Sequence, residues 1–226
     1  MRNVLLLLLL SLVACAPAGL PTQPNAREWN LLTADYQWLE GVRNSQKKPS
    51  STASRKERIE LLLANHKSIE PTYVTFMDKV REYYDRTSDP RAAAILAREK
   101  ILLGDEYMSV LSRYDRAIEL YRDALEFQPG SAEVIERIRL AEARRFVSME
   151  AFAQVKTGMR SEAVERLVGL PREDWIKQVV QNNRAFSVWI YPKADGGAAA
   201  VYFDNGVVYH TNWNAAAPSA EAQSAQ

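Results

Sequence analysis

The hydrophobic pattern of the chain changes its period near residue 148. From residue 27 to about 147, apolar residues recur three and four positions apart, which predicts a series of α-helices. After two further short helices, apolar and polar residues alternate between runs of turn residues, which predicts an antiparallel sheet. We therefore expect an α+β chain, with an N-terminal helical region followed by a small domain of two helices and three to four strands.

Capping and helix-breaking residues divide the helical region. The polar, serine-rich segment 46–55 predicts a loop, and Pro71 suits the first turn of a third helix. Asp89-Pro90 predicts the N-cap and first residue of a fourth helix, which we expect to be interrupted at Gly104-Asp105. Pro129 ends the helix that follows.

Capping and turn residues also divide the small domain into elements. Ser148 and Ser161 are predicted to cap two short helices, and Asp204-Asn205-Gly206 predicts a tight hairpin. Residues 175–180 are expected to add a fourth strand. The last residues, 215–226, are small and polar, which predicts a disordered tail.

The first fifteen residues have the pattern of a targeting segment. Arg2 precedes an apolar core at residues 4–13, which as a helix would span roughly 15 to 17 Å, about half of a ~30 Å hydrocarbon layer. Leu12-Val13-Ala14-Cys15 resembles the lipobox of bacterial lipoproteins. This resemblance implies cleavage after residue 14 and lipidation of Cys15. An ordinary secretory signal cleaved after Ala16 is the alternative.

The lipoprotein resemblance also implies a location. In lipoproteins of double-membraned bacteria, a residue other than Asp after the lipidated cysteine, here Ala16, favours the outer membrane. Residues 15–26 contain three prolines and no charge, so we expect a flexible linker of roughly 30 Å before the helical region. The body is then expected in the periplasm, anchored to the membrane through Cys15.

Charge and cysteine content exclude several classes of function. Removal of residues 1–14 takes away one charge, Arg2, from 29 basic residues, which leaves 28 basic and 28 acidic residues. A near-neutral chain argues against a nucleic-acid partner, which requires a basic surface. With its single cysteine lipidated, the chain would hold no disulfide and no thiolate metal site.

One helical segment resembles part of a tetratricopeptide repeat. Residues 114–129 match the second helix and closing proline of such a repeat, with small residues at Ala117 and Ala124 and Tyr121 between them. The match covers about half a repeat. A plain helical bundle is the alternative for residues 27–147.

The C-terminal third resembles the SmpA/OmlA (BamE-like) lipoprotein domain. The resemblance rests on residues 155–171, on the W-x-Y strand at 189–191, and on the hairpin 201–209 with its glycine turn. It covers residues 148–214 and implies two helices packed on a small antiparallel sheet that binds another protein. Here more than a hundred helical residues separate that domain from the lipidation site, unlike in its small members.

No catalytic constellation is evident. His66 and His210 lie in different predicted domains without a neighbouring acid or ligand pattern, and Glu173-Asp174 fits a turn or helix cap. We therefore expect no enzymatic activity, no cofactor and no metal site.

Aromatic residues of the predicted sheet are the candidate partner-binding residues. If Phe186, Val188, Val201 and Phe203 form the core, alternation turns three aromatic side chains outward. These are Trp189, Tyr191 and Tyr202. Exposed aromatic side chains are natural anchors for a protein partner. The alternative is that they pack against the helical domain or the tail.

These observations lead to one functional hypothesis and one alternative. We expect a non-enzymatic, outer-membrane-anchored periplasmic lipoprotein that acts as a protein-interaction scaffold or adaptor in envelope or outer-membrane protein assembly. Its expected partners are envelope proteins, with outer-membrane barrel proteins among them. The alternative is an inhibitor or ligand-binding module for a soluble periplasmic protein or a cell-wall fragment.

Overall fold

The computed structural model describes residues 25–51 and 53–218. The predicted signal peptide, Cys15 and the linker up to residue 24 lie outside the described residues, and so does the predicted tail from residue 219 onward.

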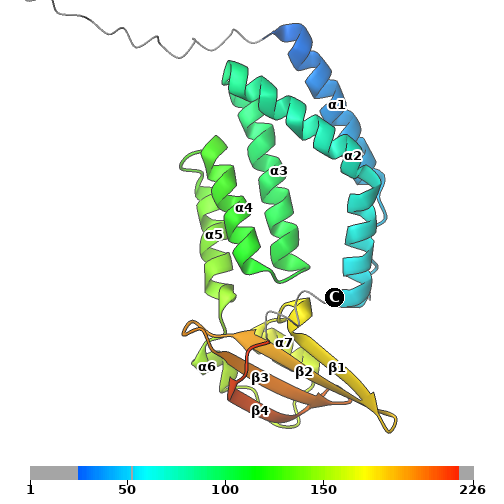
Figure 1. Ribbon diagram of the computed structural model, residues 1–226, viewed down its shortest axis with the longest axis vertical. Helices are drawn as coiled ribbons and strands as arrows, with labels where there is room; N and C mark the ends of the chain where they lie inside the picture. Colours follow the sequence, from blue (N-terminus) through cyan, green and yellow to red (C-terminus); the bar gives the residue numbers. More distant parts are fainter. Residues whose placement is uncertain (1–24, 52, 219–226) are drawn as a thin grey trace, which may run out of the picture.

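Helices come first along the chain and a sheet follows, which confirms the predicted α+β class (Figure 1). The five helices of the first part are α1 (Ala26–Ser45), α2 (Arg55–Thr87), α3 (Pro90–Ser109), α4 (Tyr114–Phe127) and α5 (Ala132–Arg145). The second part contains α6 (Met149–Phe152), α7 (Ser161–Val168), the 3-10 turn η1 (Glu173–Trp175), and the strands β1 (Ile176–Gln181), β2 (Arg184–Pro192), β3 (Ala198–Asp204) and β4 (Val207–Ala215). The last strand thus extends one residue into the predicted tail.

Pro71 does not begin a helix, contrary to the sequence prediction. It lies inside the 33-residue helix α2, which starts at the capping box formed by Ser54 and Glu57. Proline lacks the backbone N–H and its ring crowds the preceding turn, so a helix that continues through it bends. Figure 1 shows the two halves of α2 running in different directions. The two predicted helices are therefore one bent helix.

Gly104 likewise does not interrupt α3, which continues to Ser109. The glycine is buried where α3 packs on α4, and a Cβ atom at this position would lie 2.5 Å from Cε1 of Tyr121. The absent side chain makes room for the tyrosine ring, whose hydroxyl donates a hydrogen bond to Asp105 at 2.7 Å. Gly104 is thus a packing residue rather than a helix breaker. The predicted Asp89 N-cap and Pro90 first residue of α3 are present.

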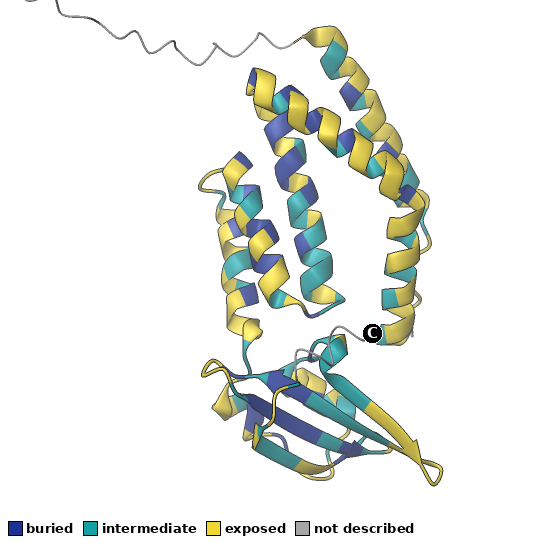
Figure 2. Ribbon diagram, in the orientation of Figure 1, coloured by how far each residue is buried: buried dark blue, intermediate teal, exposed yellow. Residues whose placement is uncertain are grey.

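Each of the two parts of the molecule has a main apolar core (Figure 2). Side chains from α1 to α5 form the first, in which Tyr83, Tyr121 and Leu39 are fully buried. The second lies between one face of the sheet and the short helices α6 and α7, and includes Phe152, Val164 and Phe203. Burial of such side chains is the main source of stability available to this chain.

The strands pair in sequence order, β1-β2-β3-β4, and every pair is antiparallel. Two-residue turns join the outer pairs: Asn182-Asn183 between β1 and β2, and the predicted Asn205-Gly206 between β3 and β4. All four of these residues have positive φ angles, which asparagine and glycine tolerate in hairpin turns. The predicted cap at Ser148 is present, but Ser161 is the first residue of α7 and Arg160 occupies the cap position.

Among the described residues, none of the helices combines the length and apolarity that a membrane span requires.

Candidate interaction sites

The register of β2 and β3 decides which aromatic side chains leave the core. Trp189 pairs with Val201 and Tyr191 pairs with Ala199, so these side chains share the face covered by α6 and α7. The predicted outward orientation of Trp189 and Tyr191 was therefore wrong. A shift of one residue in register moves every side chain of a strand to the other face, and the loop between β2 and β3 sets this register through the Lys193 N–H bond to Gly197.

Trp189 and Tyr191 are structural residues on this face. The Trp189 ring centroid lies 4.7 Å from that of Phe203. Tyr191 is 3% exposed, and its hydroxyl donates a hydrogen bond to the carbonyl oxygen of Gly169 at 3.0 Å. Burial raises the pKa of the Tyr191 hydroxyl above its ordinary value.

Tyr202 lies on the opposite face of the sheet, as predicted. It pairs with Val188 on β2 and with His210 on β4. Phe186 pairs with Asp204 and also lies on this face, which α6 and α7 do not cover. Phe186 and Val188 were predicted to share a core with Val201 and Phe203, but they lie half-buried on the other face, where Val188 packs against Ile190 and its neighbours.

An irregularity in the pairing of β3 and β4 adds a second tyrosine to this face. Phe203 pairs with Val208 and Tyr202 with His210, so Tyr209 is an extra residue in β4. At such a bulge, two residues of one strand oppose one residue of its neighbour. Simple alternation would separate Tyr209 from His210, but both rings contact Tyr202, with centroids 6.1 Å and 5.3 Å from it.

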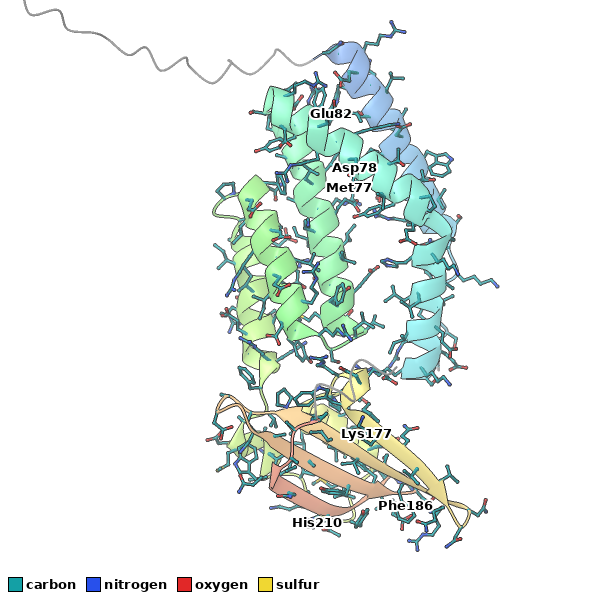
Figure 3. All side chains as sticks on the ribbon, in the orientation of Figure 1. Met77, Asp78, Glu82, Lys177, Phe186 and His210 are labelled. Carbon is teal, nitrogen blue, oxygen red and sulfur yellow. The ribbon has the colours of Figure 1, made fainter. Side chains whose placement is uncertain are left out.

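The resulting aromatic patch consists of Phe186, Tyr202, Tyr209 and His210. Tyr209 is 51% exposed and packs edge-on against Phe186, with centroids 6.4 Å apart. Figure 3 labels Phe186 and His210 on this part of the molecule, together with Lys177 of the neighbouring strand. Val179 extends the apolar surface onto β1 and is 60% exposed. An exposed aromatic surface of this kind is typical of protein interfaces.

Among the described residues, one end of this face is covered. Ile190, Ala198 and Ala200 are buried there, and the residues that pack against them are Trp175, Val188, Tyr202 and Ala215. The aromatic patch lies toward the other end, where Phe186 is close to the β1–β2 hairpin (Figure 3). Because the other end of this face is covered, the aromatic patch is the part of the face that is available to another molecule.

A second candidate is a cavity of about 780 Å³ between the first half of α2 and the second half of α3. Four leucine side chains contribute to its lining, and two of them, Leu63 and Leu102, are exposed. At its rim, His66 Nε2 lies 2.7 Å from Glu106 Oε2. This hydrogen bond raises the pKa of His66. His66 therefore links α2 to α3 through this carboxylate.

A buried ion pair closes the same cavity toward α1. Glu99 is 1% exposed, and both of its oxygens accept hydrogen bonds from Arg43, at 2.8 and 2.5 Å. Tyr36 donates a third hydrogen bond to Glu99 at 3.3 Å. Burial, followed by the charge of Glu99, raises the pKa of Tyr36 to about 12. These paired groups hold α1 against α3.

The remaining polar residues singled out in the sequence do not converge. His210 and His66 belong to different parts of the fold, and Glu173 and Asp174 lie in η1, where Asp174 pairs with Arg172 at 2.5 Å. Within residues 25–51 and 53–218, no group of three or more metal-ligating side chains occurs.

Comparison of the chain with protein-family models, with curated proteins and with solved structures finds no match.

Proposed function

We propose that this protein is a lipid-anchored periplasmic scaffold of the outer membrane that binds an envelope protein through its aromatic patch. The single observation that carries the binding proposal is the exposure of Tyr209 and His210 beside the half-buried rings of Phe186 and Tyr202. The lipobox pattern ending at Cys15 supports the anchoring proposal.

The composition of the patch fits a protein partner. Tyrosine and phenylalanine give large contact areas at low cost in conformational entropy, and they are common among residues that dominate binding energy. Arg184 stacks on Phe186, with its guanidinium carbon 5.4 Å from the ring centroid, and pairs with Asp204. A charged pair beside an aromatic centre resembles the polar rim of an interface.

The geometry also fits a scaffold. The N-terminal end of α1 lies at the opposite end of the molecule from the sheet (Figure 1). Anchoring ahead of α1 would therefore place the helical part between the membrane and the aromatic patch. A partner would be bound away from the membrane surface.

A photo-crosslinking amino acid at position 209 tests the binding proposal in living cells. We expect it to yield a crosslinked adduct with an envelope protein, identified by mass spectrometry. The same amino acid at the exposed position 136 of α5 serves as the control and is expected to yield no such adduct. Tyr202→Ser in the background with the crosslinker at position 209 is expected to weaken the adduct, since it removes a neighbouring ring.

Membrane fractionation tests the anchoring proposal separately. The Cys15→Ser variant is expected to leave the outer-membrane fraction, because no lipid can be attached. A variant that remains in that fraction would contradict anchoring. Equal adducts from positions 209 and 136 would contradict binding through the patch, whatever the fractionation shows.

A further inference from the structure

A cavity of about 380 Å³ lies at the junction of the helical part and the sheet part. The start of α4 and the end of α5 form one side, and the segment after α7 together with the end of β2 forms the other. Its apolar walls are built from residues of both parts. They are Phe146, Val147, Val168, Leu170, Pro171 and Tyr191.

The polar lining of this junction cavity is strongly positive. Two carboxylates, Asp115 and Glu119, face a larger set of guanidinium groups. The five arginines are Arg113, Arg116, Arg144, Arg145 and Arg172. A net excess of three positive charges around one cavity stands out in a chain whose whole net charge is +1.

Three of these arginines already have partners. Arg145 pairs with Asp115, Arg116 with Glu119 at 2.6 Å, and Arg172 with Asp174 at 2.5 Å. Arg113 and Arg144 differ, since neither side chain has a carboxylate within 4.0 Å in the part of the chain that the structure describes. Two guanidinium groups without an internal partner therefore border an apolar cavity.

We propose that the junction cavity binds an organic anion with an apolar ring or chain. Arg113 and Arg144 would hold the carboxylate or phosphate group, because a guanidinium offers paired donors that match such oxygens. The apolar body would rest against Leu170, Phe146 and Tyr191. A concave site of this volume, with apolar walls beside charged groups that can fix the orientation of a ligand, is typical of small-molecule sites.

The two parts of the fold both contribute to this site, so the ligand would connect them. Val147 N–H donates to the carbonyl oxygen of Pro192 at 3.0 Å, which already joins the end of α5 to the end of β2 beside the cavity. The proposal is independent of the aromatic patch, which lies toward the opposite end of the sheet.

Binding of four probes to the full chain in detergent, measured by calorimetry, tests the proposal. The probes are 2-naphthoate, 1-naphthyl phosphate, the neutral 2-naphthamide and inorganic phosphate. We expect both aromatic anions to bind at least tenfold more tightly than the amide, and inorganic phosphate to bind more weakly than naphthyl phosphate. Equal binding of acid and amide, or no binding of either aromatic anion, would overturn the proposal.

Two sets of variants locate the site. The double variant Arg113→Gln, Arg144→Gln is expected to weaken naphthoate binding at least tenfold. Arg27→Gln, Arg160→Gln is the matched control, since it removes the same charge at exposed positions away from the cavity. Leu170→Trp fills the cavity without changing charge and is expected to abolish binding. Unchanged binding in the Arg113→Gln, Arg144→Gln variant would overturn the proposal. This measurement does not depend on whether Leu170→Trp folds.

Discussion

Gly104 shows how one missing side chain sets the distance between two helices. Its position against the ring of Tyr121 leaves no room for a methyl group. The tyrosine is fully buried and is fixed through its hydroxyl by Asp105. Arg137 of α5 contacts the same carboxylate at 3.0 Å, so three helices meet around this glycine.

The variant Gly104→Ala is expected to destabilise the protein by about 1–3 kcal/mol, because the added methyl overpacks the α3–α4 contact. Chemical denaturation would measure the free energy of unfolding. Gly41→Ala is the matched control: Gly41 lies inside α1 with nothing within 4 Å of its virtual Cβ. There alanine should add up to about 1 kcal/mol of stability. Loss of stability in both variants would refute the packing explanation.

Asp89 combines a helix cap with a buried charge. Its carboxylate accepts hydrogen bonds from the Arg91 backbone N–H at 2.9 Å and from the Tyr83 hydroxyl at 3.0 Å. The hydrogen-bonded Arg91 side chain lowers the pKa of Asp89 to about 2, although burial acts to raise this pKa. The ionised form therefore stabilises the fold above the ordinary pKa of 3.8, and this stabilisation is lost as the pH falls through about 2.

The variant Asp89→Ala is expected to lose about 1–2 kcal/mol of unfolding free energy at pH 7, as helix caps commonly do. The deficit should shrink as the pH falls from 3.8 toward 2, where the native carboxylate becomes protonated. Ser131→Ala, at the cap of α5, is the control, because a hydroxyl cap carries no charge. Its deficit should stay constant over the same acid range. A constant deficit for Asp89→Ala would disprove the assigned role of its charge.

At the scale of elements, strand alternation and the caps at Ser148 and Asp89 were predictable, while the cap of α7, the bend in α2 and the bulge in β4 were not. The caps at Ser148 and Asp89 depend on local chemistry, and the Asn205-Gly206 turn on backbone preference. The continuation of α2 through Pro71 depends on the helices that pack against both halves of α2, and the sequence near Pro71 does not encode those contacts. Asn182-Asn183 could have been recognised as a hairpin turn, since asparagine tolerates positive φ.

The candidate site was only partly predictable for the same reason. Tyr202 was assigned to the uncovered face, but the orientation of Trp189 depends on the register of β2 against β3, which loop geometry determines. The extra residue at Tyr209 leaves no mark in the alternation of the strand. Likewise, the junction cavity joins Arg113 to Leu170, residues far apart in the chain, and only the packed fold brings them together.

The buried Glu99–Arg43 pair gives a prediction for helix assembly. Glu99→Leu should lose about 1–3 kcal/mol of unfolding free energy, less than a fully buried pair would, because Arg43 is 22% exposed and also pairs with Glu40. The double variant Arg43→Met, Glu99→Leu should lose less than Glu99→Leu alone, since no charge is left unpaired. In a double-mutant cycle measured by urea denaturation, a double-variant loss equal to the sum of the losses of Arg43→Met and Glu99→Leu would show that the pair is not coupled.

At the scale of the whole molecule, Arg55 joins the two parts of the fold. It stands at the start of α2 and donates hydrogen bonds to the carbonyl oxygens of Pro171, at 2.6 Å, and Val110, at 3.3 Å. A third bond reaches Ser112 Oγ at 3.1 Å. Burial lowers the pKa of Arg55. One guanidinium group thus holds the α3–α4 loop against the segment that leads from α7 into the sheet.

Replacement of Arg55 by alanine should loosen this junction without unfolding either part, because each part keeps its own apolar core. Hydrogen–deuterium exchange is expected to rise at residues 110–113 and 171–175, the two segments that Arg55 connects, and to stay unchanged in the centre of β3. Arg58→Ala, one turn further along α2, is the control and should leave both segments protected. If Arg55→Ala raises exchange in α2 alone, the two parts are held together by other contacts, and the proposed ligand cavity at their junction would not depend on this arginine for its shape.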